Sequence, residues 1–275
     1  MPSGLASGCA ASMVHLAPAI EKTVIGRVQA ARRQAGATPG LDLPAPRLPW
    51  RLLWWPCCGS TEQRLEQELS CGGQPPLAVL AGHQRFGHGQ RGRPWISPPG
   101  GVWLSAALPW PAEPAAGAAL GLAVAVGLAL QLEALGLTVQ LKWPNDLLVN
   151  GRKLAGLLPR LSLRGPAIRL ARVGVGLNGR NRVPPGAISL REALGRQTTA
   201  SDVPALTARV LAALEWAVFR STSPELVRRL AERRLLVPVE GVDYRRERWQ
   251  VEGLSVDGGL LLSRAGERIL RRRSF

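Results

Sequence analysis

The chain has 275 residues, 46% of them hydrophobic, and its 35 Lys and Arg against 19 Asp and Glu give a formal net charge of +16. The apolar fraction indicates a globular chain, and the length allows one large domain, alone or with a small one. The charge fits ATP, an acidic protein or nucleic acid as a partner, but charge of this kind indicates nothing about fold.

Residues 1–48 are rich in small residues and proline and are weakly patterned, apart from one candidate helix over residues 19–34. We expect much of this extension to be poorly ordered, and Met13 is a candidate for the true first residue. No basic segment precedes an apolar run here, so no secretory signal is expected. The adjacent Cys57 and Cys58 fit reduced residues of a cytoplasmic protein. The cysteines show no paired CxxC spacing and the three histidines complete no metal-ligand set, so no metal site made of side chains is expected.

From Trp50 the pattern sharpens into short strands and one helix. The expected elements are strands over residues 50–58, 76–82 and 101–110 and a helix over residues 60–69. Ser60 or Thr61 suits the N-cap of that helix. Residues 83–101 are rich in glycine and proline and predict a loop.

Residues 115–136 are almost wholly apolar and just long enough to resemble a membrane span. They consist mainly of Ala, Gly and Leu, and the segment ends with Gln131 and Glu133. We therefore predict a core helix packed against a sheet, and no membrane association.

The stretch LKWPNDLLVNGRKLAG predicts a β-hairpin after a strand over residues 138–143, with Asn150-Gly151 as a type I′ turn. In a regular register Leu148 opposes Lys153 and Asp146 opposes Ala155. Lys153 and Asp146 would then be diagonal neighbours on one face, roughly 7–8 Å apart at Cα. This arrangement fits a pocket, and it also fits a surface ion pair.

The remaining chain predicts a strand over residues 167–178, helices over residues 203–219 and 223–236, and short strands beyond. We thus expect an α+β fold in which helices pack on a mixed, largely antiparallel sheet, followed by a small β-barrel. The expected division is an extension over residues 1–48, a main domain over 49–234 and a small domain over 235–275.

Scarce residue types gather in two places. The chain has three lysines, of which Lys142 and Lys153 flank Asp146 in the predicted hairpin. Its four asparagines are Asn145 and Asn150 in the same stretch and Asn178 and Asn181 in VGVGLNGRN. Because lysine is a compact point charge and arginine a planar fork, lysine in an arginine-rich chain indicates a position that arginine does not suit. The two clusters form a candidate site.

The loop over residues 85–95 offers backbone N–H groups freed by glycine, together with Gln90, Arg91, Arg93 and Trp95. Such a loop suits phosphate or carboxylate, although it lacks the spacing of the GxxxxGK[ST] phosphate loop. Trp95 could stack on a flat base or simply anchor the loop in the core.

Three segments, AGHQRFGHGQRGRPWISPPGGVWLS, LKWPNDLLVNGRKLAGLL and VGVGLN, resemble in sequence and order the signatures of biotin protein ligases. CGSTEQRL upstream is similar to the Ser-Thr-Asn segment of that family. The resemblance covers about residues 50–270. It implies a class II synthetase-like catalytic domain, a small C-terminal SH3-like barrel, and a monofunctional type, because residues 1–48 contain no convincing helix-turn-helix for DNA.

The resemblance implies a two-step ligase that uses ATP and Mg²⁺, converts biotin to biotinyl-5′-AMP, and transfers it to a lysine of the biotin carboxyl carrier protein of acetyl-CoA carboxylase. Lys153 would be the essential residue, with Asp146 and Lys142 beside it. By position, the biotin-binding residues would be Ser60, Thr61, Glu62, Gln84, Gly87, His88, Gly89, Gln90 and Lys153. The residues for ATP and the adenylate would be Arg91, Arg93, Trp95, Asn145 and Asn178, with Mg²⁺ held by the phosphates near the two asparagines.

The chain departs from that family at three positions: Glu62 stands in place of Asn, and His88 and Gln90 stand in place of Arg. The alternatives are a lipoyl or octanoyl transferase of the same superfamily and a basic nucleic-acid-binding protein without activity. The first is disfavoured by KWPND, and the second leaves the placement of the scarce lysines unexplained. A homodimer is compatible with the sequence.

Overall fold

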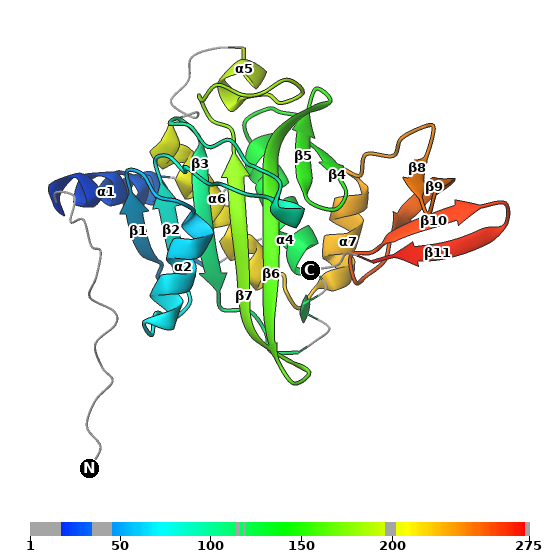
Figure 1. The fold of residues 1–275 in the computed structure, drawn as a ribbon, viewed down its shortest axis with the longest axis horizontal. Helices are drawn as coiled ribbons and strands as arrows, with labels where there is room; N and C mark the ends of the chain where they lie inside the picture. The colour runs from blue at the N-terminus through cyan, green and yellow to red at the C-terminus, as the bar shows by residue number, and fades with distance from the viewer. Residues whose placement is uncertain (1–17, 35–45, 114–115, 118, 196–201, 273–275) are drawn as a thin grey trace.

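The computed structural model describes residues 18–34, 46–113, 116–117, 119–195 and 202–272. Its centre is a seven-stranded sheet in the order β1-β2-β3-β7-β6-β5-β4 (Figure 1). The strands are β1 (Arg51–Trp55), β2 (Leu77–Ala81), β3 (Val102–Leu108), β4 (Gln140–Lys142), β5 (Asp146–Val149), β6 (Arg152–Arg164) and β7 (Ala167–Leu177). Only β1 and β2 pair in parallel; the other neighbours are antiparallel, as predicted.

Helices cover both faces of this sheet. The α4 helix (Leu120–Glu133) and α6 (Val203–Phe219) pack against one face, and α2 (Thr61–Ser70) covers β2 and β3 on the other. Two short helices, α5 (Leu190–Ala193) and α7 (Pro224–Glu232), follow β7 and α6. Nearly every residue of α4 is buried, which confirms the predicted core helix. Within the described ranges, no helix combines the length and apolar character needed to cross a bilayer.

The α1 helix (Pro18–Gln34) forms where the sequence predicts it and packs against α6 and β1. Val28 is 1% exposed in the main core. The buried Glu215 of α6 accepts hydrogen bonds from Arg32, from the backbone N–H of Leu48 and from the indole of Trp50. The candidate helix is therefore present, and a buried carboxylate and an apolar residue hold it to the core. Met13 lies outside the described residues.

A second, four-stranded antiparallel sheet forms the C-terminal part, in the order β11-β10-β9-β8. Its strands are β8 (Val242–Tyr244), β9 (Glu247–Leu254), β10 (Leu260–Arg264) and β11 (Glu267–Arg271). Leu254 N–H donates to Glu232 of α7, and the Trp143 indole donates to the carbonyl of Gly258. The small all-β unit predicted beyond residue 235 is present. It is hydrogen-bonded to α7 and to Trp143, which follows β4 of the main sheet.

Gly127 of α4 sets how closely α4 and α6 approach each other. A Cβ added there would lie 2.5 Å from the carbonyl oxygen of Ala213 in α6, and backbone cannot move aside as a side chain can. Gly127→Ala should therefore lower the free energy of unfolding by about 1–3 kcal/mol, despite the better helix propensity of alanine. Thermal unfolding followed by circular dichroism measures the change.

Gly26→Ala in α1 is the matched control, because no atom lies within 4 Å of its added Cβ. It should raise stability by about 0.5–1 kcal/mol. If both substitutions stabilise the protein, the α4–α6 contact is not limited by Gly127.

Candidate functional site

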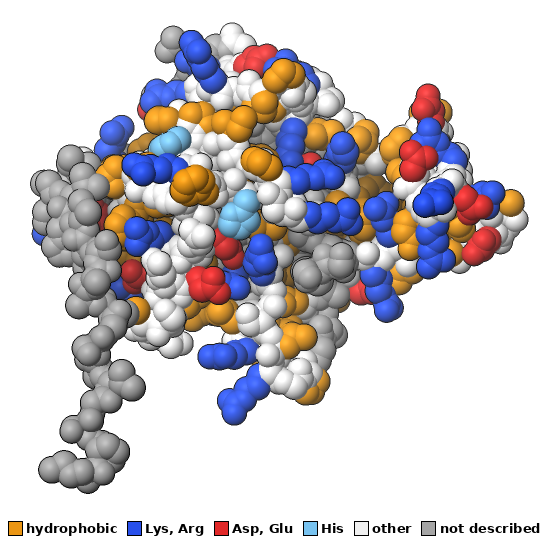
Figure 2. Space-filling view, in the orientation of Figure 1, with side chains coloured by type: hydrophobic (Ala, Val, Ile, Leu, Met, Phe, Trp, Pro, Cys, Tyr) orange, Lys and Arg blue, Asp and Glu red, His pale blue; other side chains and the backbone are white. Residues whose placement is uncertain are grey.

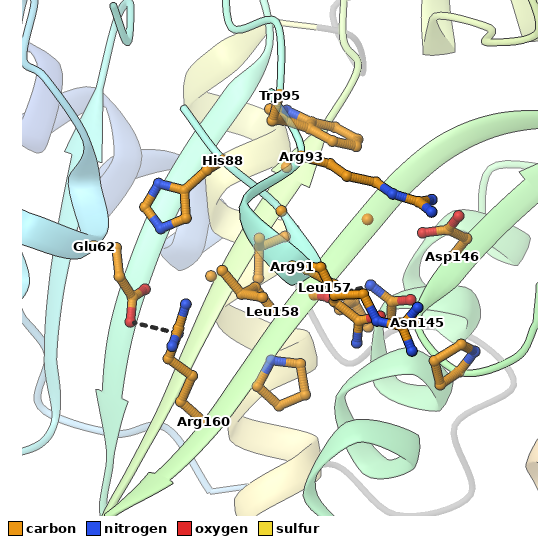
Figure 3. A pocket seen from close by; sticks show the side chains of 18 of the residues that line it. Glu62, His88, Arg91, Arg93, Trp95, Asn145, Asp146, Leu157, Leu158 and Arg160 are labelled. Carbon is orange, nitrogen blue, oxygen red and sulfur yellow. Dashed lines mark hydrogen bonds and ion pairs between the residues drawn. The ribbon is translucent and has the colours of Figure 1, made fainter. Parts of the chain in front are cut away.

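A pocket of about 620 Å³ opens on the face of the main sheet that α2 partly covers (Figure 3). It is bordered by β6, β7, the N-terminus of α2, the loop over residues 84–95, the turn over residues 143–146 and the end of β11. Figure 2 shows Lys and Arg side chains gathered near the middle of this face. Four of the arginines in the lining are Arg91, Arg93, Arg271 and Arg272.

The floor of the pocket is a stretch of sheet without side chains. Side chains alternate between the two faces of a strand, and in β7 Val173, Val175 and Leu177 are buried in the main core. Gly174 and Gly176 therefore face the pocket, and Gly156 of β6 pairs with Gly176 across the strands. The Val-Gly-Val-Gly sequence was the available signal for this bare floor, and the sequence analysis assigned it no role.

Trp95 lies flat over this floor. A Cβ on Gly176 would come within 2.5 Å of Trp95 Cε2, and one on Gly156 within 2.9 Å of Cζ3. The ring also meets Trp103 edge to face at 6.4 Å between centroids. Its buried Nε1 has no hydrogen-bond partner. The absence of side chains at Gly156 and Gly176 thus leaves the space that the indole occupies.

Lys153 stands at one end of the floor and contacts Asp146, with 2.7 Å between Nζ and Oδ1. The ammonium also lies 4.8 Å from the centroid of the Trp95 ring, within cation–π range. Asp146 Oδ1 is buried and makes no contact of hydrogen-bond geometry, so the pair is held by charge. The predicted grouping of Lys153 and Asp146 is confirmed.

The register of the hairpin differs from the regular one at one point. Asn150 and Gly151 have φ of 51° and 69°, and Leu148 pairs with Lys153, as predicted. A β-bulge then shifts the ladder, so that Asp146 pairs with Gly156 and not with Ala155. The extra residue of the bulge strengthens the local twist, and Asp146 and Lys153 still point into the same pocket.

A chain of hydrogen bonds lines the end of the pocket near α2. Ser60 caps α2 by accepting from Glu62 N–H. The Gln84 side-chain oxygen accepts from both the N–H and the hydroxyl of Thr61, and its nitrogen donates to Ser97. The Thr61 hydroxyl also meets Ser105 Oγ at 2.9 Å. These contacts fix the orientation of the polar groups that border the pocket.

Cys58 lies next to this network through a bridge to Gln84. Burial raises the pKa of the Cys58 thiol to about 11. The thiol therefore stays protonated at neutral pH and is a poor nucleophile.

The predicted loop contains one short turn, η1 (Gln90–Gly92), in which Arg91 has φ of 55°. Gly89 N–H donates to the carbonyl of Arg93, and His88 bridges Pro94, so the loop folds back on itself over the pocket. Arg91 and Arg93 are both exposed. Their guanidinium groups are accessible to an anion.

Three predicted site residues do not line the pocket: Gly87, Lys142 and Asn178. Gly87 is buried and its added Cβ would clash with Ser97 and Trp95. Lys142 is exposed on β4. Asn178 is buried, accepts from Asn181 and donates weakly to the carbonyl of Lys153 at 3.4 Å. Its place beside the phosphates stays a prediction, and its amide supports the Lys153 backbone.

The lining also includes residues that the sequence analysis missed. Arg271 and Arg272 reach it from the C-terminal sheet, and Arg271 lies 5.2 Å from the ring centroids of both Trp143 and Tyr244. Nothing local in the sequence marks this contact. Asn145, which was predicted, lines the pocket but donates its amide to the carbonyl of Leu157 at 2.6 Å.

A comparison with protein families finds that residues 54–178 match the biotin/lipoate A/B protein ligase family. Among curated proteins, the bifunctional ligase/repressor BirA of Escherichia coli is 35% identical over 205 residues, which is 69% of this chain and 62% of the relative. The biotin–[acetyl-CoA-carboxylase] ligase of Paracoccus denitrificans is 39% identical over 116 residues, 40% of this chain and 47% of that protein. The chain thus spans less than two thirds of the length of these relatives.

Among solved structures, biotin protein ligase from Aquifex aeolicus in complex with biotin and ATP matches with a TM-score of 0.62 and 26% identity. The match covers 81% of this chain and 99% of that one. Residues 54–178 thus match the biotin/lipoate A/B protein ligase family, and most of the chain is similar to biotin protein ligases. Within it, the relatives and structures named above are biotin protein ligases or the bifunctional ligase/repressor.

A substitution at Gly176 tests whether the lack of a side chain there makes room for the Trp95 ring. The three atoms nearest to its added Cβ all belong to Trp95. Gly176→Ala should therefore lower the free energy of unfolding, measured by chemical denaturation, by about 1–3 kcal/mol. In a protein that also carries Trp95→Ala, this loss of unfolding free energy should be smaller by about 0.5–3 kcal/mol, because the clash is then gone.

Gly89→Ala is the control, since its added Cβ would meet nothing closer than 3.8 Å. An equal cost of Gly176→Ala with and without the indole would contradict the contact between Gly176 and Trp95.

Proposed function

We propose that the chain is an ATP-dependent biotin ligase that forms biotinyl-5′-AMP and transfers the biotinyl group to a lysine of a biotin carboxyl carrier protein. The observation that carries the proposal is Lys153, paired with Asp146 and stacked against Trp95 at the end of a floor made of glycines. The family match and the structural likeness to a ligase complexed with biotin and ATP support it.

The pocket suits an acid with a polar ring and an aliphatic chain. The bare backbone at Gly174, beside the part of the floor that Trp95 covers, accepts a flat apolar body, and Thr61, Gln84 and Ser105 offer hydrogen-bonding groups at one end. At the other end Lys153, Arg91 and Arg93 offer positive charge to a carboxylate. Biotin has this distribution of groups.

In the first step a carboxylate oxygen of biotin forms a bond to the α-phosphorus of ATP, and the bond to the leaving pyrophosphate breaks. Two anions must approach each other, so cations held in place lower the barrier. We assign this role to Lys153, oriented by Asp146, and to the arginines of the loop.

Mg²⁺ bound to ATP would offset further phosphate charge. Among the described residues there is no cluster of three or more His, Cys, Asp or Glu, so the phosphates themselves would supply much of its coordination. Asn145 lines the pocket and would offer an oxygen to it, while Asp146 Oδ1 already contacts Lys153 Nζ at 2.7 Å.

In the second step the neutral amine of the acceptor lysine forms a bond to the acyl carbon, the bond to the phosphate oxygen of AMP breaks, and the amine loses a proton. The mixed anhydride must be protected from water meanwhile. The loop with Gly89 and Arg93 folds over the pocket and can provide this cover. The carrier-protein partner, a homodimer, a cytoplasmic location and the lack of DNA binding stay predictions of the proposal.

Exchange of labelled pyrophosphate into ATP tests the function. A biotin ligase exchanges label only when biotin is present, because the adenylate forms reversibly. Exchange that depends on lipoate or octanoate in place of biotin would indicate a lipoyl-type enzyme. No exchange with any acid, together with salt-dependent binding of nucleic acid, would indicate the basic binding protein.

Lys153→Arg should lower biotin-dependent exchange by orders of magnitude while the protein stays folded. The charge remains, but a planar fork replaces a compact ammonium beside Asp146 and Trp95. Lys22→Arg, at an exposed position on α1, is the control and should exchange at the wild-type rate. Near-normal exchange by Lys153→Arg would remove Lys153 from the reaction.

Trypsin should cut the free protein after Arg91, which is exposed and followed by Gly92 in the loop. The Arg93–Pro94 bond resists trypsin because proline follows it. Biotin plus ATP should slow the cut, since ligands would order the loop and shield Arg91. Equal rates of cleavage with and without ligands would show that the loop does not close over them.

A further inference from the structure

Lys142 carries an exposed amine next to the pocket, and the reaction derived above does not use it. The residue ends β4 and lies outside the pocket lining. No ion pair or hydrogen bond joins its ammonium to another described residue. Lysine is scarce in this chain, so an unpartnered lysine at this position calls for an explanation.

The pairing of β4 with β5 puts Lys142 on the pocket side of the sheet. Leu141 and Leu147 pair across these two strands, and both are buried in the main core on the opposite face. Side chains alternate along a strand, and residues paired across two strands share a face. Lys142 and its partner Asp146 therefore both point to the pocket side, with their Cβ atoms about 4.5–5.5 Å apart.

Asp146 lies beside the place where the acid would be activated. It lines the pocket, and its Oδ1 contacts Lys153 Nζ at 2.7 Å. Lys153 is the cation assigned above to the reacting carboxylate, so the acyl carbon of the adenylate would lie close to both residues. Lysine carries its amine on a flexible stem of four carbons. From the position opposite Asp146, the amine of Lys142 can thus approach the same acyl carbon.

The chain has few other side-chain amines that could reach this carbon. Its three lysines are Lys22, Lys142 and Lys153. Lys22 is exposed on α1, which packs on α6 and β1, and β1 and β4 are the opposite edges of the main sheet (Figure 1). The ammonium of Lys153 is held by Asp146 and by the ring of Trp95. Lys142 is therefore the lysine that combines proximity to the pocket with an unpartnered amine.

We propose that Lys142 is a site of self-biotinylation: when no acceptor protein is present, its neutral amine attacks the adenylate bound in the same molecule. Nζ forms an amide bond to the acyl carbon, the bond from that carbon to the phosphate oxygen breaks, AMP leaves, and the nitrogen loses a proton to solvent. The inference rests on the proposed function of the same pocket. Lys142 then acts as an internal acceptor, in the position that an acceptor lysine of another protein would otherwise approach.

Incubation of the full chain with biotin, ATP and Mg²⁺, without an acceptor protein, tests the proposal. Peptide mass spectrometry measures the biotinyl group on each of the three lysines. Lys142 should carry the dominant label, while Lys153 should stay unmodified because Asp146 and Trp95 hold its ammonium. Since the reaction occurs within one molecule, the labelled fraction of Lys142 at a given time should not change with protein concentration.

A biotin active ester supplied in solution is the matched chemical control, because it acylates lysines without using the pocket. Lys22 and Lys142 are both exposed, so the ester gives the ratio of their labelling that exposure alone produces. The ratio of Lys142 to Lys22 labelling obtained with biotin and ATP should exceed that ratio about ten-fold or more. Lys142→Arg removes the amine and should lose the dominant label without transferring it to Lys22.

The two labelling ratios are both measured on the wild-type protein, so the test stands even if Lys142→Arg does not fold. Equal ratios with the ester and with biotin plus ATP would show that the label comes from adenylate released into solution, and would overturn the proposal. A dominant label on Lys153 would also overturn it, as would biotin-dependent pyrophosphate exchange without any label on Lys142. If wild type shows no biotin-dependent exchange at all, the proposed function itself is overturned.

Discussion

The close approach of the Trp95 indole to bare backbone is the constraint on which the pocket depends. Strand alternation buries Val173, Val175 and Leu177 on one face of β7 and leaves glycine on the other. With a side chain on Gly176, the indole would have no room, and the ammonium of Lys153 would lose its aromatic contact. The same strand therefore contributes to the core through the apolar side chains on one face and shapes the site through the glycines on the other.

Charge at the two ends then gives the pocket a direction. Asp146 fixes Lys153 at one end, while Arg160 and Arg172 hold the carboxylate of Glu62 at the other. A buried charge without any compensating partner would be strongly destabilising. Each end is tolerable because its charge is paired.

Local patterns predicted the fold well because they depend on neighbours in sequence. The Asn150-Gly151 turn, the α4 helix and the capped start of α2 at Ser60 all formed as expected. The bulge that re-pairs Asp146 is not visible in the sequence, because a regular register and a bulged one share the same alternation. The contact of Arg271 with Trp143 joins residues far apart in the chain, and no local pattern indicates it.

The two sheets contribute unequally to the pocket. Residues 54–178, which match the family, contain the whole lining apart from Arg271 and Arg272. The floor, the loop and both charged ends thus lie within the matched residues, while the C-terminal sheet adds two cations at the rim. Arg271 is held there by the rings of Trp143 and Tyr244, and the Trp143 indole donates to Gly258. Trp143, two residues before Asn145 in the lining, therefore links the small sheet to the side of the pocket where Asn145 lies.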